Sequence, residues 1–351
     1  MRCTFLLAMV FLAVSCSQRG MIDGVRLEYV SPDKTVSLAA SSRLALPEVM
    51  RCNAIQLIQD TILVLQDRAT EDNIHHFKAY SVNSSDYLGA FVRLGRGPGE
   101  MISPHVVKSA AYVEWLILND NAMRKAWAVD VVESTVSGSM IAADLFELPA
   151  GVVDWTILPD SCRFSLRLEH GKAVFHTEDS GSSVLNSYSL NDAVDSEQSL
   201  IYLSGFLTDD GVSGKVAEAM VFFPQINIFD TKAGLTRSLA TSKACRYWKT
   251  MVSGMPDMST VEYYEGIAAT EDYIFAAYRG VPLDRLDEQG PGSSIHILDW
   301  NGDFLYDVRV DENIGDIAFD ERTQRLYCID RLEGGVVVYD LDALNLRSPL
   351  R

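Results

Sequence analysis

The chain has 351 residues, with 30 Lys and Arg against 48 Asp and Glu, so its formal net charge is −18. This acidic balance argues against nucleic acid and against a polybasic membrane patch, because both partners need clustered cations. Hydrophobic residues make up 48% of the chain and charged residues 22%, which is typical of a folded globular protein.

Residues 1–15 have the pattern of a secretory signal peptide. Arg2 is the only charge before position 16, and an apolar stretch follows from residue 4 to residue 14. This stretch is too short for a transmembrane helix, which needs ~20 apolar residues. Residues 12–16, Leu-Ala-Val-Ser-Cys, resemble the lipobox of bacterial lipoproteins. The resemblance implies cleavage before Cys16 and a lipid on its sulfur; ordinary secretion with a free Cys16 thiol is the alternative.

Residues 16–24 are predicted to form the anchor and a short tether. Position 17 is Ser, so the Asp that resembles an inner-membrane retention signal is missing. We therefore expect an outer-membrane lipoprotein that faces the periplasm and touches the membrane through its lipid anchor only. Four cysteines remain outside the signal and the anchor, and they are compatible with disulfides or with buried thiols: Cys52, Cys162, Cys245 and Cys328.

The rest of the chain is rich in short strand patterns separated by turns. The clearest case is residues 294–310, where Asn301-Gly302 stands between two β-rich runs and predicts a hairpin. Candidate first strands of a four-strand unit begin near residues 53, 105, 152, 212, 263 and 314, about fifty residues apart. A repeat of this length is typical of a β-propeller.

The sixth unit ends before its fourth strand, whereas residues 25–47 contain β-rich stretches without a unit of their own. An open ring would leave an unpaired strand edge, so we expect this segment to pair beside residues 335–340 and close the ring. The sequence thus predicts an all-β fold, a six-bladed propeller with four-stranded blades, as a single domain over residues 25–351.

Residues 94–100, Leu-Gly-Arg-Gly-Pro-Gly-Glu, follow the first unit. This motif resembles the signature of the six-bladed, TolB-like propeller lipoproteins of Bacteroidota. The resemblance implies fold and cellular address more than activity. The loop is either a backbone nest that offers Arg96 and Glu100 to a ligand, or a tight crossover in which glycines supply positive φ angles.

Polar residues stand at the starts of the first strands, which approach the channel of a propeller: Asn53, His105, Asp154, Glu265 and Asp316. They line a water-filled channel or, in the alternative reading, four of them (Asn53, Asp154, Glu265 and Asp316) bind calcium through oxygen ligands, as in the propeller lactonases that this arrangement resembles. Arg279, before the loop of residues 281–293, is a candidate contact for an anion. We expect Arg96, Glu100, His105 and Arg279 to share one ligand-binding mouth.

The sequence contains neither a Gly-x-Ser-x-Gly elbow nor a His-Glu-x-x-His motif. The first interpretation is therefore a non-catalytic binding or scaffolding lipoprotein of the cell envelope, with an envelope protein, a peptide or a small ligand as partner and no cofactor. The alternative is a calcium-dependent hydrolase or lactonase with its ion in the channel.

Overall fold

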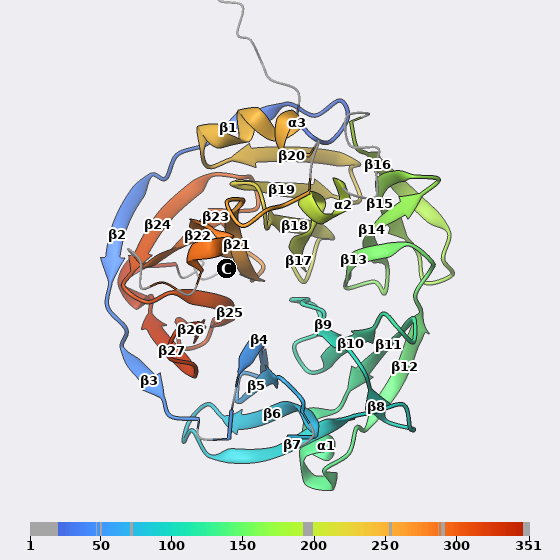
Figure 1. The fold of residues 1–351 in the computed structure, drawn as a ribbon, viewed down its shortest axis with the longest axis vertical. Coiled ribbons are helices and arrows are strands. Elements are labelled where there is room, and N and C mark those ends of the chain that lie inside the picture. Colours follow the sequence, from blue (N-terminus) through green and yellow to red (C-terminus); the bar gives the residue numbers. More distant parts are fainter. Residues whose placement is uncertain are drawn as a thin grey trace, which may run out of the picture.

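Six small sheets surround a central axis in the computed structural model (Figure 1). The structure describes residues 20–46, 48–49, 51–70, 73–191, 199–252, 255–286, 288 and 292–346. The predicted six-bladed β-propeller is confirmed, whereas Cys16 and the predicted signal peptide lie outside the described residues. Within the described part of the chain, no helix is long and apolar enough to cross a membrane.

The first three blades follow one another along the chain. Blade one contains β4 (Cys52–Ile58), β5 (Ile62–Asp67), β6 (His75–Ser81), β7 (Tyr87–Leu94) and β8 (Glu100–Met101). Blade two contains β9 (Pro104–Val106), β10 (Leu116–Asp120), β11 (Lys125–Val129), α1 (Val131–Ser137) and β12 (Ala142–Glu147). Blade three contains β13 (Val152–Ile157), β14 (Arg163–Glu169), β15 (Lys172–Glu178) and β16 (Val184–Ser189).

The last three blades complete the ring. Blade four follows α2 (Ser199–Leu203) and contains β17 (Gly205–Asp209), β18 (Lys215–Met220), β19 (Gln225–Asp230) and β20 (Leu235–Ala240), with η1 (Lys243–Tyr247) and α3 (Trp248–Met251) behind it. Blade five contains β21 (Val261–Ala269), β22 (Tyr273–Pro282), η2 (Leu283–Arg285), β23 (Ser293–Asp299) and β24 (Phe304–Val310). Blade six contains β25 (Ile314–Asp320), β26 (Arg325–Asp330) and β27 (Val336–Asp340), followed by η3 (Asp342–Leu344).

The N-terminal segment closes the ring as predicted. Strand β3 (Ser42–Leu44) pairs antiparallel with β27, in the register Val336 to Leu44 and Val338 to Ser42. The segment does more than the sequence indicated, because β1 (Leu27–Tyr29) and β2 (Lys34–Leu38) first add parallel outer strands to blades four and five. Figure 1 shows these three strands in blue along the outer circumference. One short segment therefore ties together three consecutive blades.

The fourth blade begins earlier than the sequence pattern indicated. We expected its first strand near residue 212, but β17 covers Gly205–Asp209 and residue 212 lies in the turn that follows. The five-residue strand directly after α2 is too short for its alternation to be recognised. The first strands of the other five blades begin within two residues of the predicted positions.

The core lies between blades, because each blade buries both of its faces against its neighbours. Strand β5 shows this in an unbroken buried run from Ile62 to Leu65. Between blades three and four, the Phe229 ring packs at a tilt against Phe164 and Phe175, with ring centroids 4.7 and 4.9 Å away. Such packing holds the inner strands rigidly around the channel.

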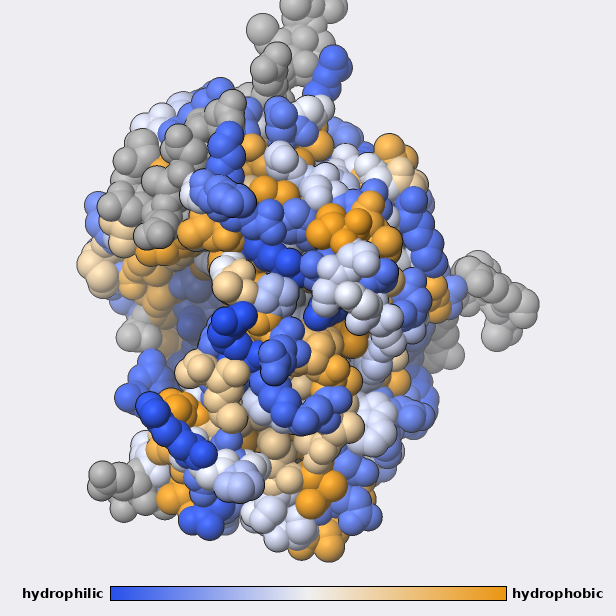
Figure 2. Space-filling view, turned by 90° about the vertical axis from the view of Figure 1, so that its right-hand side faces the viewer, coloured by the Kyte–Doolittle hydropathy of each residue, from blue (hydrophilic) through white to orange (hydrophobic). Residues whose placement is uncertain are grey.

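The outer rim is mixed in character. Figure 2, which shows the right-hand side of the ring, has small hydrophobic groups separated by hydrophilic residues. The four cysteines outside the signal and the anchor are free thiols: Cys52, Cys162, Cys245 and Cys328. Of the two alternatives open from the sequence, the structure therefore has thiols without disulfides.

Candidate functional site

Two adjacent cavities open on the face where the inner strands begin. The first, of about 420 Å³, lies among blades one, two, three, four and six, and the second, of about 610 Å³, lies among blades four, five, six and one. Asn53, Phe206 and Asp316 line both. We call the two cavities together the mouth. Each cavity alone has a volume that is usual for a pocket that binds a small organic ligand, ~300–1,000 Å³.

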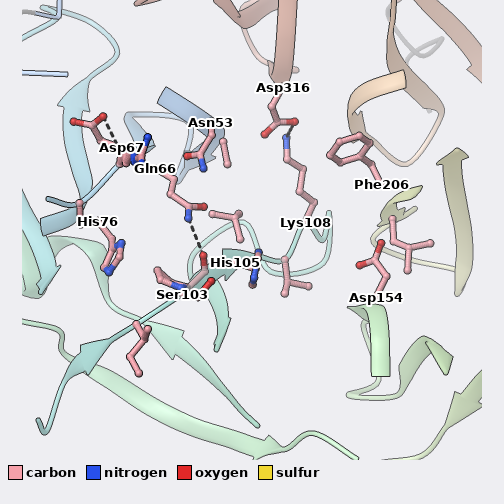
Figure 3. A pocket seen from close by; sticks show the side chains of 18 of the residues that line it. Asn53, Gln66, Asp67, His76, Ser103, His105, Lys108, Asp154, Phe206 and Asp316 are labelled. Carbon is pink, nitrogen blue, oxygen red and sulfur yellow. Dashed lines mark hydrogen bonds and ion pairs between the residues drawn. The ribbon is translucent and has the colours of Figure 1, made fainter. Parts of the chain in front are cut away.

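An ion pair across the channel forms the floor of the mouth. Lys108, just after β9, extends its ammonium group to Asp316 on β25, with Nζ 2.6 Å from Oδ1 (Figure 3). The side chains are only 10% and 5% exposed. Nζ also donates to the backbone carbonyl of Ile317. Because Lys108 also lines the small cavity at the opposite end of the channel, its side chain separates the two ends.

Asp154 is the carboxylate of the first cavity with fewest partners. Its one hydrogen bond with the described residues is accepted by Oδ1 from the backbone N–H of Trp155, at 2.8 Å. Burial raises the pKa of Asp154 to about 7. Glu218 on β18 is a second buried acid nearby; burial and the charge of Asp154 raise the pKa of Glu218 to about 8. Near neutral pH both groups hold a proton much of the time, so Asp154 can donate a hydrogen bond to a ligand.

The two histidines of the first cavity differ in their hydrogen bonding. His76 is held by a 3.0 Å contact between Nε2 and the carbonyl oxygen of Met101, in which the ring N–H donates. His105 is exposed, and its side chain has no hydrogen-bond partner in the described ranges. Desolvation lowers the pKa of His105, so a neutral imidazole faces the cavity opposite Asn53 and Gln66 in Figure 3.

The four residues predicted for a calcium site are divided by the structure. Asn53, Asp154 and Asp316 line the first cavity, whereas Glu265 lines only the second. Asp316 is occupied by Lys108 and by the backbone N–H of Ile55, at 3.0 Å from Oδ2. Glu265 is similarly engaged by Arg279 and Arg331.

Among the described residues, no three His, Cys, Asp or Glu side chains are arranged to hold a metal ion. The lysine ammonium stands where the alternative interpretation places a cation. The residues present therefore do not fit a calcium ion, and no reaction step is derived through one.

The loop of residues 95–99 is folded on Glu100. The backbone N–H of Gly97 donates to Glu100 Oε2 at 2.8 Å, and a Cβ added to Gly95 would lie 2.0 Å from the same oxygen. The glycines therefore make room for an internal cap, as the crossover interpretation of this loop expects. Arg96 is exposed and lies outside both cavities, although the neighbouring Leu94 lines the first.

Arg279 is committed inside blade five. Its Nη1 lies 3.2 Å from Glu265 Oε1, both side chains are 2% exposed, and Nη2 donates to the carbonyl of Leu286. The loop after it does reach the mouth, because Leu283 and Leu286 line the second cavity. The structure thus places the predicted mouth elements on one face but does not bring Arg96, Glu100, His105 and Arg279 together. The role of these four in binding stays a prediction.

Outside the mouth, one serine–histidine contact resembles part of a catalytic pair. Ser187 Oγ lies 2.9 Å from His176 Nδ1, and His176 Nε2 lies 3.2 Å from Glu169 Oε1. The second contact lacks hydrogen-bond geometry, since Nε2 is buried and has no hydrogen-bond partner among the residues that the structure describes. Ser187 sits on the outermost strand of blade three, away from the mouth. We therefore assign no catalysis to this contact.

The closed ring of six blades around a floored mouth defines the class of this protein, a six-bladed β-propeller. No family model and no curated protein matches the chain. Among solved structures, the fold is similar to a provisionally named exported protein from Bacteroides fragilis, with a TM-score of 0.53 and 14% identity over 87% of this chain and 99% of that chain.

Two further solved structures share the fold. A member of the DUF4221 family from Bacteroides vulgatus has a TM-score of 0.51 and 9% identity, over 86% of this chain and 96% of that chain. A luciferin-regenerating enzyme has a TM-score of 0.50 and 11% identity, over 85% of this chain and 94% of that chain. At these identities the comparisons show the fold alone. Membership of the TolB-like lipoprotein family stays a prediction.

Proposed function

We propose that this chain is a non-catalytic binding protein of the cell envelope, anchored by a lipid on Cys16, whose ligand occupies the mouth. The observation that supports the proposal is a large cavity that is closed at its base and lined by polar side chains without hydrogen-bond partners among the described residues. The side chains of Asn53 and His105 have no hydrogen-bond partner in the described part of the chain. In a binding site such groups can form hydrogen bonds with the ligand.

Apolar surface lies next to these polar groups. Phe206 is half-buried and lines both cavities, and Trp155 lines the first. The indole Nε1 of Trp155 is buried, and no described residue hydrogen-bonds to it. A ligand with an apolar or ring-shaped body and a few polar groups, such as a small organic solute or a peptide end, matches this lining better than a metal ion does.

The proposal is tested by screening the purified protein for ligands by thermal shift, with sugars, short peptides and organic anions. We expect at least one class to raise the melting temperature, because a ligand that binds only the folded state stabilises it by mass action. Phe206→Ala and His105→Ala should weaken that ligand, whereas Tyr247→Ala, an exposed aromatic outside both cavities, should not. Equal loss in all three variants, or no ligand in any class, would contradict the proposal.

A further inference from the structure

Two exposed arginines stand side by side at the edge of the mouth. Arg51 directly precedes β4 and Arg68 directly follows β5. The backbone N–H of Arg68 donates to the carbonyl of Arg51 at 3.2 Å, which extends the antiparallel pairing one step beyond Cys52 and Asp67. Residues opposite each other in such a pair project their side chains to the same face of the sheet. The two side chains therefore start from neighbouring positions on the same face.

A buried carboxylate fixes the backbone beneath both arginines. Asp67 Oδ1 accepts the backbone N–H of Arg51 at 2.7 Å and that of Arg68 at 2.9 Å. Its other oxygen, Oδ2, accepts from Lys78 Nζ at 2.7 Å and from Asn73 Nδ2 at 3.0 Å. The Lys78 ammonium thus neutralises Asp67, and the two positive charges above it remain.

Neither guanidinium has an ion pair with a carboxylate of the described residues. Blade six offers an internal comparison, because Arg331 occupies the position of Arg68 and donates its backbone N–H to Asn313 at 2.9 Å. Arg331 is neutralised by Glu265, with Nη1 2.7 Å from Oε2. Like charges directly opposite each other across two strands are unfavourable. The two arginines are thus not neutralised by any described residue, and on a chain of net charge −18 such a pair favours an external anion.

The position of the pair connects it to the ligand site. Arg51 lines the second cavity and Arg68 lines the first, while Asn53, two residues after Arg51, lines both. The arginines therefore stand where the two cavities meet. A ligand that spans this boundary places one end between them, with the unengaged amide of Asn53 as a further donor.

We infer that Arg51 and Arg68 together bind an anionic group of the ligand in the mouth, a carboxylate or a phosphate. The guanidinium group presents its N–H donors in a planar fork that matches either anion in a bidentate manner. This inference deepens the proposed function and rests on it, since it specifies the chemical class of ligand for the same site. His105 and Asp154 keep their proposed role, which is to contact the rest of the ligand.

The test is isothermal titration with inorganic phosphate and, separately, with citrate, so that the two anion chemistries are distinguished. The variants are Arg51→Ala with Arg68→Ala, and Arg51→Lys with Arg68→Lys. The matched control is Arg93→Ala with Arg322→Ala, which removes two exposed arginines outside both cavities and outside the predicted binding residues. Urea unfolding of each variant establishes that it is folded.

We expect the double alanine variant to lose affinity for at least one anion by about tenfold or more. The lysine variant should fall between it and the wild type, because lysine keeps the charge and loses the fork, and the control should bind like the wild type. Wild-type protein that binds neither anion at millimolar concentration would overturn the inference, as would an equal loss in the control. If neutral sugars or uncharged peptides still bind the wild type, only the anion inference is contradicted. If they do not bind either, the proposed function is contradicted as well.

Discussion

The floor of the mouth yields a quantitative prediction about stability. Lys108 and Asp316 form a mostly buried ion pair with Nζ 2.6 Å from Oδ1. The pair joins blade two to blade six, and Asp316 also accepts the backbone N–H of Ile55 in blade one. Either Lys108→Met or Asp316→Asn removes one partner and leaves the other side chain buried without its counterpart.

The structure sets the size of the expected effect. Breaking a buried pair from one side typically costs about 3–5 kcal/mol, because an uncompensated charge remains. Lys108→Met should fall near the lower limit, about 3 kcal/mol, since Asp316 keeps the Ile55 N–H and burial already raises its pKa, so it can take up a proton. The double variant should lose less than the sum of the single losses, by about 1–3 kcal/mol, because neither charge is then left alone.

Urea unfolding followed by fluorescence and circular dichroism measures these free energies. Lys125 and Asp144 provide the control, because their Nζ–Oδ2 distance is also 2.6 Å but their side chains are 33% and 65% exposed. Lys125→Met should cost no more than about 1 kcal/mol, as is usual for exposed pairs. If Lys108→Met costs no more than Lys125→Met, or if the Lys108 and Asp316 losses simply add, the buried-pair account of the floor is wrong.

Three further predictions concern other parts of the molecule. Burial raises the pKa of Glu218 to about 8, so the stability that its protonated form contributes is lost as pH rises from about 4.5 to 8. Glu218→Gln stays neutral; its free energy of unfolding should match the wild type near pH 4.5 and exceed it by a few kcal/mol (about 1.4 per unit of pKa shift) at pH 8.5, and parallel pH profiles would refute this. Cys16→Ser should abolish lipid labelling and release the protein from membranes; a variant that stays membrane-bound would point to another anchor. Calcium should not raise the melting temperature of the wild type, because Lys108 occupies the channel, and a saturable calcium-dependent rise would restore the metal interpretation.

The sequence predicts the ring where the signal is local. Asn301-Gly302 gives the hairpin between β23 and β24, and the unpaired β-rich N-terminal segment predicts the closure by β3. The sequence does not predict which blades the other two N-terminal strands join, because their partner strands are distant in the chain. The outer strands β1 and β2 pair with partners such as Ser238 and Tyr306, which are 211 positions from Leu27 and 272 positions from Lys34, so no local pattern identifies their place.

The same limit applies to the site. The polar starts of the inner strands predicted five channel-lining residues. Four of them line the first cavity (Asn53, His105, Asp154 and Asp316), whereas Glu265 lines the second. Their role in binding stays a prediction. The partner of Asp316 was missed, because Lys108 is 208 residues away in the chain. The role of Arg51 and Arg68 could not be predicted either. The sequence shows the Asp that ends the second strand of the unit, but it does not show whether a carboxylate pairs with either arginine in the folded protein.

The most direct test of a ligand-binding mouth is a crystal structure of the protein with the strongest ligand from the screen. The account predicts that the ligand lies across the boundary of the two cavities, with its body against Phe206 and its anionic group between Arg51 and Arg68. A ligand bound on the outer rim, at the loop of residues 95–99 or at the opposite end of the channel, with the mouth filled only by water, would contradict it.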